Sequence, residues 1–571
     1  MPMSLDKVFY TQLQGKHEIR VAVIQPGTRH DLVSIQLAVV DLDDEPSYDA
    51  LSYVWGDSLK LKQILCDGRQ TAVTANLYWA LARVRSPDKK VAVWADAICI
   101  NQDDLQERSS QVGYMDRVFS NARRVWVCMG DSTHGQAEQI GKLVRDVLKN
   151  GLENRLARLR SEALFHNDGR WRYLSKLLRN PWFGRAWVIQ EVGLARSAIV
   201  LYGQGQFDYR DFMRVAEWAA GIPMSSQFHI GIRFIHTQWK DWSQRSSGYS
   251  FLNLLEHAST LRCTDPRDLV YAFLGHNLAR ANTGEPIITA DYTKPYMEVW
   301  QEVMGPLLLE NGPRALSAIR HDERSIEENW PSWVPRWNTG YEMNNLVHAA
   351  ERWSLPYKTL TDTSIAPNGD KLLLAGVGLD EVKASYWMHF FPERSLIVFE
   401  DSSTGECKSF NEIYGEYVSS AASRADVAKS FVSAIFGGSM EVDDGGRTLS
   451  FTASEDHHPF LRKLFSGGQQ SDNKKYKNST HKCWMVCQFL GSGRSFIVTK
   501  KGFFGLAPYI ARPGDLCYAI AGARVLFAFR PTAGKKSLRV LGESYLQGFM
   551  QGEISRMIEG GQLSETRLTV Q

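Results

Sequence analysis

The sequence lacks the features that define several large classes of protein. It contains no apolar run of about 20 residues, so no membrane span is expected. The first residues, MPMSLDKVFYTQ, hold no apolar core of a secretion signal, and this favours a cytoplasmic location. Lysine and arginine outnumber aspartate and glutamate only by 66 to 63. No nucleic-acid partner is therefore predicted, because such a partner needs a strongly basic surface.

Nucleotide loops and metal motifs are also missing. There is no G-x-x-x-x-G-K-[ST] loop and no G-x-G-x-x-G after a strand, which argues against an ATPase or a Rossmann dehydrogenase. The eight cysteines are widely scattered, as in a chain with reduced thiols. Cys483 and Cys487 lie four residues apart, outside the spacing of structural zinc sites, so no metal is expected. Cys99 has no histidine near it in sequence and is predicted to be buried rather than nucleophilic.

The most regular segment of the chain lies between residues 91 and 130. An apolar strand (91–95) leads into a polar loop (101–104), a helix (107–122) and a second apolar strand (125–129). This order is typical of a parallel α/β sheet, which presents its functional groups in loops at the carboxyl ends of the strands. The loop at 101–104 is in such a position.

Flanking segments extend the same pattern. The hairpin expected from 62–66 and 70–73 turns at Asp67-Gly68, and a helix is predicted to begin at Asn180-Pro181 and continue to about 194. Further strands are predicted at 48–54 and 197–202. Together they predict an α/β fold with a small doubly wound parallel sheet and helical insertions.

Three blocks of sequence carry a family resemblance. They read YDALSYVWGD at 48–57, WADAICINQDDLQERSSQV at 94–112 and RNPWFGRAWVIQE at 179–191. In this order they resemble the fungal heterokaryon-incompatibility (HET) domain. Lesser similar features follow at 263–275, 291–292 and 542–548. The resemblance implies a role in fungal non-self recognition and programmed cell death.

A second resemblance concerns the first and third blocks. YDALSY at 48–53, together with Trp187 and Glu191 four residues apart, is similar to the TIR domain. That resemblance implies a TIR-like (flavodoxin-like) fold, self-association, and Glu191 as the catalytic carboxylate that cleaves the nicotinamide–ribose bond of NAD. A carboxylate beside the ribose can stabilise the oxocarbenium-like charge of such a reaction.

The candidate substrate-binding residues surround Glu191 in this interpretation. They lie at strand ends, in the following loops or in the third block: Ser52, Tyr53, Trp55, Asp57, Asp96, Asn101, Arg185 and Trp187. Structural roles compete with each assignment. Arg185 can form an ion pair with Glu191, Asp96 can cap a turn, Asn101 can satisfy loop backbone groups, and Trp187 can be a core residue.

The predicted organisation has five parts. These are an N-terminal β arm (1–45), a HET, TIR-like domain (46–275), a mainly helical middle region (276–435), flexible Gly/Ser/Lys-rich loops (436–480) and a C-terminal β-rich domain (481–571). The alternative to an NAD hydrolase is a non-enzymatic signalling or scaffold module, which self-associates, recruits partners and has a protein partner as its trigger. A third hypothesis is that the C-terminal β region binds a ligand.

Overall fold

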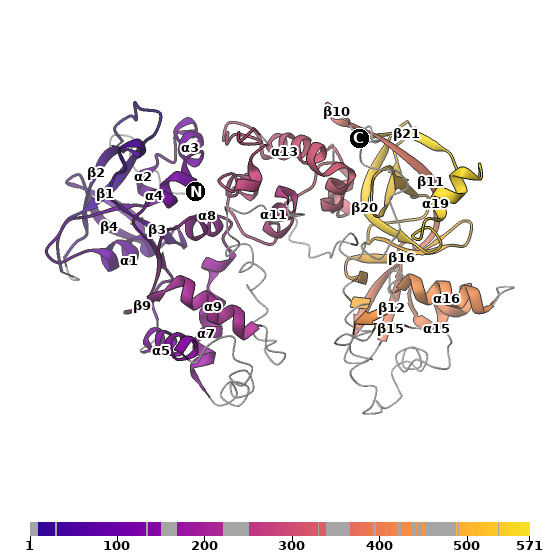
Figure 1. Cartoon of the computed structure of the whole chain (residues 1–571), viewed down its shortest axis with the longest axis horizontal. Helices are drawn as coiled ribbons and strands as arrows, with labels where there is room; N and C mark the ends of the chain where they lie inside the picture. The colour runs from indigo at the N-terminus through magenta and orange to yellow at the C-terminus, as the bar shows by residue number, and fades with distance from the viewer. Residues whose placement is uncertain are drawn as a thin grey trace. The chain divides into compact units, whose positions relative to one another are not determined.

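The structure of the chain is a computed structural model, and it describes two compact units, Met1–Val299 and Trp300–Gln571. The described residues are 10–28, 31–132, 135–149, 168–220, 250–281, 283–328, 330–338, 346, 366–391, 396–418, 424–435, 441–443, 448–450, 487–488, 490–534 and 536–571. Figure 1 shows the first unit in indigo to magenta and the second from rose through orange to yellow. Among the described residues, no helix has both the length and the apolar character that crossing a bilayer requires.

A nine-stranded sheet forms the centre of the N-terminal unit. In spatial order its strands are β5 (Arg69–Thr74), β4 (Leu61–Cys66), β2 (Ser34–Asp41), β1 (Glu18–Ile24), β6 (Val91–Trp94), β3 (Asp49–Tyr53), β7 (Val125–Cys128), β8 (Ala198–Tyr202) and β9 (Gly205–Asp208). The four strands β6, β3, β7 and β8 run parallel to one another, as the sequence predicted. The carboxyl ends of these strands therefore lie along one edge of the sheet.

The rest of the sheet corrects the expectation of a purely parallel sheet with a separate N-terminal arm at 1–45. β1 pairs antiparallel with both β2 and β6, and it is buried along most of its length. Its sequence, EIRVAVI, is nearly continuous in apolar residues, as expected of a strand covered on both faces. The segment 18–41 is thus an integral part of a mixed sheet.

The helices of the N-terminal unit begin and end at the following residues. They are α1 (Ala75–Val84), α2 (Asp96–Cys99), α3 (Leu105–Val112), α4 (Met115–Asn121), α5 (Gln136–Lys149), α7 (Arg170–Leu178), the 3-10 helix η3 (Pro181–Gly184), α8 (Val188–Gly193), α9 (Tyr209–Ala220), α11 (Phe251–Ala258) and α12 (Asp268–Tyr271).

Two helices expected to be continuous are each divided in the structure. The helix predicted at 107–122 becomes α3 and α4, because the backbone of Tyr114 leaves the helical region between them. The helix predicted at 180–194 becomes η3 and α8, because Arg185 is extended (φ −81°, ψ 138°). The break places Trp187 at the N-terminal cap of α8 rather than inside a helix.

The C-terminal unit is built on a ten-stranded sheet. Its strands are β10 (Ala366–Asn368), β11 (Lys371–Phe391), β12 (Leu396–Asp401), β13 (Cys407–Ser409), β16 (Arg494–Thr499), β17 (Phe504–Pro508), β18 (Leu516–Ile520), β19 (Leu526–Pro531), β20 (Leu538–Leu546) and β21 (Glu565–Val570). The path runs from β11 through β16, β17, β20, β19 and β18, and β18 pairs back with β11. The strands therefore close into a barrel, which removes exposed sheet edges.

β11 makes this closure possible because it is 21 residues long and bends. Its pairing register shifts between Gly378 and Asp380 and again between Val382 and Ala384. Such bulges curve a strand, so one half of β11 can pair with β18 and the other with β12 and β16.

Helices complete the unit. They are α13 (Tyr296–Asn311), the 3-10 helix η7 (Gly312–Ala318), α14 (Glu323–Glu327), α15 (Phe410–Tyr417), α16 (Arg424–Ile435) and α19 (Glu553–Glu559). Figure 1 shows α15 and α16 next to β12. An aromatic cluster joins them to the barrel, with the rings of Phe431 and Phe496 4.9 Å apart and those of Phe410 and Phe431 5.7 Å apart.

The predicted boundaries in this half need correction. The middle region expected at 276–435 contains the strands β10 to β13 beside its helices, among them the long strand β11, and the division between units falls at residues 299 and 300 rather than at 275. The loops expected at 436–480 lie outside the described residues, apart from a short hairpin of β14 (Glu441–Asp443) and β15 (Thr448–Ser450). The strands predicted from residue 494 onward are present.

The close approach of β17 to β20 generates a stability prediction. A Cβ atom on Gly505 would lie 2.1 Å from the backbone oxygen of Tyr545. Gly505→Ala should therefore lower the free energy of unfolding by roughly 1–3 kcal/mol, through forced movement of a packed strand. Urea denaturation of the purified chain measures this change.

Gly415 in α15 supplies the matched control, because no atom lies within 4 Å of the position that a Cβ on this residue would occupy. Gly415→Ala should leave stability unchanged or raise it by about 0.5–1 kcal/mol, as expected for alanine in a helix. Equal effects of the two substitutions would contradict the close packing inferred at Gly505.

Candidate functional site

Glu191 lies in the interior of the N-terminal unit, where α8 packs against β3. Ser52, near the end of β3, donates its hydroxyl hydrogen to Oε2 of Glu191, and Trp182 Nε1 donates to Ser52 Oγ at 2.8 Å. Only 2 % of Glu191 is exposed. The first and third sequence blocks therefore meet at this carboxylate.

Arg185 neutralises Glu191 directly. Its two terminal nitrogens face the carboxylate, with NH1 3.1 Å from Oε2 and NH2 3.1 Å from Oε1. Burial raises the pKa of Glu191, and the attraction of Arg185 and the hydrogen bond from Ser52 oppose that rise. Burial also disfavours the charged form of Arg185, but attraction to Glu191 and Asp96 outweighs it, so the pKa of Arg185 is raised. The pair is a bidentate, desolvated ion pair.

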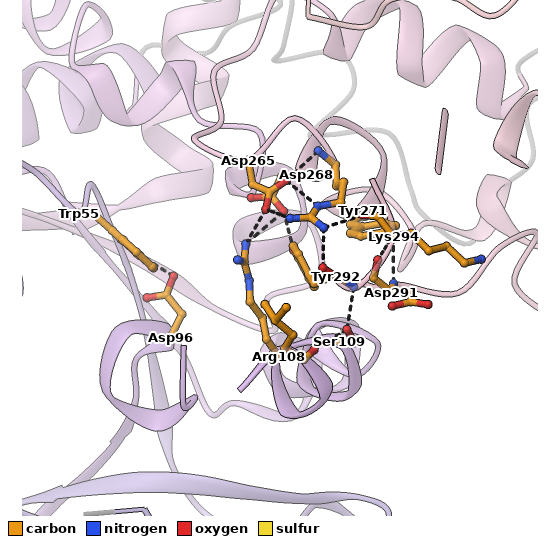
Figure 2. A network of polar contacts seen from close by, with 12 residues as sticks. Trp55, Asp96, Arg108, Ser109, Asp265, Asp268, Tyr271, Asp291, Tyr292 and Lys294 are labelled. Carbon is orange, nitrogen blue, oxygen red and sulfur yellow. Dashed lines mark hydrogen bonds and ion pairs between the residues drawn. The ribbon is translucent and has the colours of Figure 1, made fainter. Parts of the chain in front are cut away.

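Asp96 forms the outer part of the same cluster. It lies directly after β6 and accepts hydrogen bonds from Tyr53 Oη at 3.0 Å and from Trp55 Nε1 at 2.8 Å. Figure 2 shows the indole of Trp55 pointing at this carboxylate. Gln102 Nε2 donates to the backbone oxygen of Asp96 at 2.9 Å and so fixes the loop. Five of the sequence-derived candidates therefore gather around Glu191, namely Ser52, Tyr53, Trp55, Asp96 and Arg185.

Three other candidates lie in different contacts. Asp57 closes an exposed turn, with its carboxylate accepting the backbone N–H of Leu59. Asn101 satisfies loop groups, since its side-chain oxygen accepts the N–H of Asp103. Trp187 is half-buried and donates to the carboxylate of Asp268, so its bond leads away from Glu191. Trp187 and Glu191 were expected to share one helix face, but their side chains do not line the same site.

A second polar network surrounds Asp268 (Figure 2). Tyr292 donates its hydroxyl to Asp268 Oδ1 at 2.5 Å, and the guanidinium of Arg108 lies over the Tyr292 ring, 3.7 Å from its centroid. Arg108 NH2 is also 3.5 Å from Asp265 Oδ2 and 3.9 Å from Asp268 Oδ1. Arg267 holds Asp265 on the other side, with NH2 to Oδ2 at 2.8 Å.

In sequence these residues stood out only as family features at 263–275 and 291–292. In the structure they attach the segment 263–292 to α3, since Arg108 and Ser109 both belong to that helix and Ser109 Oγ accepts the N–H of Tyr292 at 2.8 Å. The alternation of acidic and basic residues in TDPRD was the available signal. Its partner on α3 could not be identified from sequence, because Ser109 and Tyr292 lie 183 positions apart.

Glu107 on α3 contacts another element, because a buried arginine of β1 binds its carboxylate. Arg20 on β1 is 1 % exposed and donates from NH1 and NH2 to the two oxygens of Glu107 at 2.5 and 2.9 Å. Glu107 Oε1 also accepts the backbone N–H of Asn101 at 2.7 Å. This contact fixes the polar loop that follows β6.

Nucleophilic and metal chemistry find little support among the described residues. Burial raises the pKa of the Cys99 thiol to about 12, which leaves no reactive thiolate near neutral pH. His17, Asp41 and Asp43 approach one another. Their atoms have structural partners, because Asp41 caps a turn through the N–H of Asp43, and Asp43 pairs with His17 and Arg117.

Comparison with known proteins fits this geometry. Residues 48–191, which contain Ser52, Asp96, Arg185 and Glu191, match the model of the heterokaryon incompatibility protein (HET) family, and residues 470–562 match the Het-6 beta-barrel domain. The two matched segments are therefore similar to a HET domain and to a Het-6 beta-barrel domain. The chain is similar to "Heterokaryon incompatibility protein 6, OR allele" of Neurospora crassa, at 23 % identity over 94 % of this chain and 96 % of that protein. No solved structure matches the chain.

The Asp268 network generates a pH-dependent prediction. Burial raises the pKa of Asp268 from its ordinary 3.8 to about 6, so between these values the folded protein holds a proton that the unfolded chain has lost. The stability that this proton contributes is present at acid pH and is lost as the pH rises from about 4 to about 6. Asp268→Asn should remove this pH dependence of the unfolding free energy, which amounts to about 3 kcal/mol between about pH 4 and pH 6.

Urea denaturation of the two proteins between pH 4 and pH 7 measures the effect. The variant should gain stability relative to the parent as the pH rises. The exposed Asp291 is the control, since hydrogen bonds from Thr293 lower its pKa and Asp291→Asn should change stability little and in the opposite sense. A parent-to-variant difference that is independent of pH would contradict the raised pKa of Asp268.

Proposed function

We propose that this chain acts in fungal non-self recognition as a non-enzymatic signalling module, whose N-terminal unit works through its surface rather than through bond cleavage. The observation that supports this proposal is the state of Glu191. Its carboxylate is buried, both oxygens face Arg185, and Ser52 donates to one of them. A carboxylate with its lone pairs occupied in this way has a structural role unless Arg185 moves away.

In this proposal the three sequence blocks serve to build one rigid unit. Ser52 on β3, Asp96 after β6 and Glu191 on α8 are held through Arg185, Tyr53 and Trp55. Such a unit presents a constant outer surface for self-association and for a protein partner that acts as the trigger. Programmed cell death would then follow from assembly.

A second candidate function is TIR-like hydrolysis of NAD. Two observations favour it, namely the raised pKa of Glu191 and the gathering of polar and aromatic groups around the Arg185–Glu191 pair. Perturbed carboxylates with such neighbours are common in active sites. For cleavage of the nicotinamide–ribose bond, Arg185 would have to leave Glu191 so that the carboxylate could approach the ribose, and NAD would then be the substrate.

Glu191→Gln separates the two functions because it retains the size of the side chain and removes its charge. The non-enzymatic proposal predicts no free nicotinamide when the intact parent protein is incubated at high concentration with NAD. It also predicts that the variant loses roughly 3 kcal/mol of unfolding free energy, since Arg185 is left with an uncompensated buried charge. Chromatographic detection of nicotinamide and urea denaturation provide the two measurements.

The control is Asp57→Asn, which removes a negative charge from an exposed turn. It should leave both measurements unchanged. Nicotinamide released by the parent and not by Glu191→Gln would establish the hydrolase and reject the non-enzymatic proposal. Release by both proteins would also reject it, and would place the reaction at another group.

A further inference from the structure

Two adjoining cavities open on the barrel of the C-terminal unit. The first has a volume of about 670 Å³ and the second about 690 Å³. They share eight lining residues, which are Arg512, Arg530, Pro531, Thr532, Ala533, Lys536, Ser537 and Thr569. The shared wall makes the two cavities neighbours, which together form a hollow, and each has the size that proteins use for small-molecule ligands.

The strands around this hollow come from distant parts of the sequence. β11 begins at Lys371, β19 and its following turn supply residues 530–534, 536 and 537, and β21 supplies residues 566–569. Leu372 on β11 pairs with Val570 on β21, and Figure 1 shows these two strands side by side. The closed barrel thus holds the lining backbone in place.

Positive charge dominates the lining of the first cavity. Its basic side chains are Lys371, Arg512, Arg530, Lys536 and Arg539, whereas its single acidic side chain is Glu327. Arg539 is held by the backbone oxygens of Ile326 and Glu328, which orient the guanidinium without neutralising it.

The acidic residues of the second cavity are already paired. Asp515 is 1 % exposed and binds Arg530 through two contacts of 2.9 Å, and Glu381 lies 2.7 Å from Lys500. The remaining basic side chains of this lining are Arg512, Lys536 and Arg567.

Four of these basic side chains are left without an acidic partner in the described part of the chain. No carboxylate there lies within ion-pair distance of Lys371, Arg512, Lys536 or Arg567. The hydroxyls of Thr532 and Ser537 on the shared wall already have partners within the protein, since Thr532 Oγ1 donates to the backbone oxygen of Ser537 and Ser537 Oγ donates to Oε1 of Gln571. The guanidinium and ammonium groups are the donors that suit phosphate.

We propose that this hollow binds a compact ligand that carries two or more phosphate groups. More than one group is required because the charges are distributed. Arg512 and Lys536 belong to the shared wall, Lys371 and Arg539 to the first cavity alone, and Arg567 to the second alone. A single phosphate in one cavity leaves the cations exclusive to the other cavity without a ligand, whereas a linked pair can place one group in each.

Isothermal titration calorimetry of the full chain with inorganic pyrophosphate tests the proposal. Pyrophosphate should bind at least about 10-fold more tightly than orthophosphate, because it can use two sets of cations. Arg512→Gln should weaken pyrophosphate binding by about 10-fold or more. Arg567→Gln should weaken pyrophosphate binding and leave orthophosphate binding nearly unchanged.

Lys383→Gln is the matched control, because Lys383 is exposed on β11, the strand that begins at Lys371, and lines neither cavity. It should change affinity by less than about 2-fold, as expected for an exposed charge outside the lining that is screened by salt. Circular dichroism and thermal denaturation verify that each variant is folded.

Several results would overturn the proposal. These are no heat of binding with pyrophosphate, an equal loss of affinity in Lys383→Gln and Arg512→Gln, or equal affinities for orthophosphate and pyrophosphate. Tighter binding of malonate than of pyrophosphate would replace phosphate by carboxylate as the group recognised. The outcome is independent of the NAD assay, because none of the residues involved belongs to the N-terminal unit.

Discussion

The buried ion pair between Arg185 and Glu191 is the contact on which the candidate site depends. Burying two charges costs several kcal/mol each, and the cost is offset only when geometry is good and the remaining lone pairs are satisfied. Here both conditions hold, since the contact is bidentate and Ser52 supplies a further hydrogen bond. Residues that lie up to 139 positions apart in sequence are thereby required to meet.

The same physical device recurs through the molecule. Arg20 binds Glu107 beneath the polar loop of the N-terminal unit, and Arg494 contacts Glu543 inside the barrel, where neither side chain is exposed. In each case an arginine with several donors bonds a carboxylate and nearby backbone oxygens. Buried pairs of this kind restrict which strands and helices can pack together, and this helps to explain how a chain with few long apolar segments specifies two compact units.

The sequence predicted the parallel core of the first sheet because those strands are short apolar runs bounded by turns or helices. It did not predict that β1 joins the same sheet, since the apolar residues of a strand indicate that the strand is buried but not which strand it pairs with. The helix at 180–194 was predicted as continuous because Asn180-Pro181 is a good helix start, and the helix was expected to continue to about 194. The extended backbone at Arg185, which divides it, is imposed by tertiary contacts such as the isolated bridge between Arg185 and Arg262.

The sequence indicated which residues would lie near Glu191, and their role in function stays a prediction. Ser52, Tyr53, Trp55, Asp96 and Arg185 do surround Glu191, because strand ends of a parallel sheet meet at one edge. Sequence could not decide between a solvated catalytic carboxylate and a neutralised one, since that depends on the orientation of Arg185. Asp57 was assigned to the site from its place at the end of the first strand and Trp187 from the TIR resemblance, whereas their side chains contact other partners.

A double-mutant cycle on this ion pair tests the central claim most directly. Unfolding free energies would be measured for the parent, Arg185→Met, Glu191→Gln and the double variant. If the pair holds the unit together, each single substitution removes a partner and leaves a buried charge, so the double variant should be at least about 2 kcal/mol more stable than the sum of the single effects predicts. Additive effects within about 0.5 kcal/mol would contradict the account.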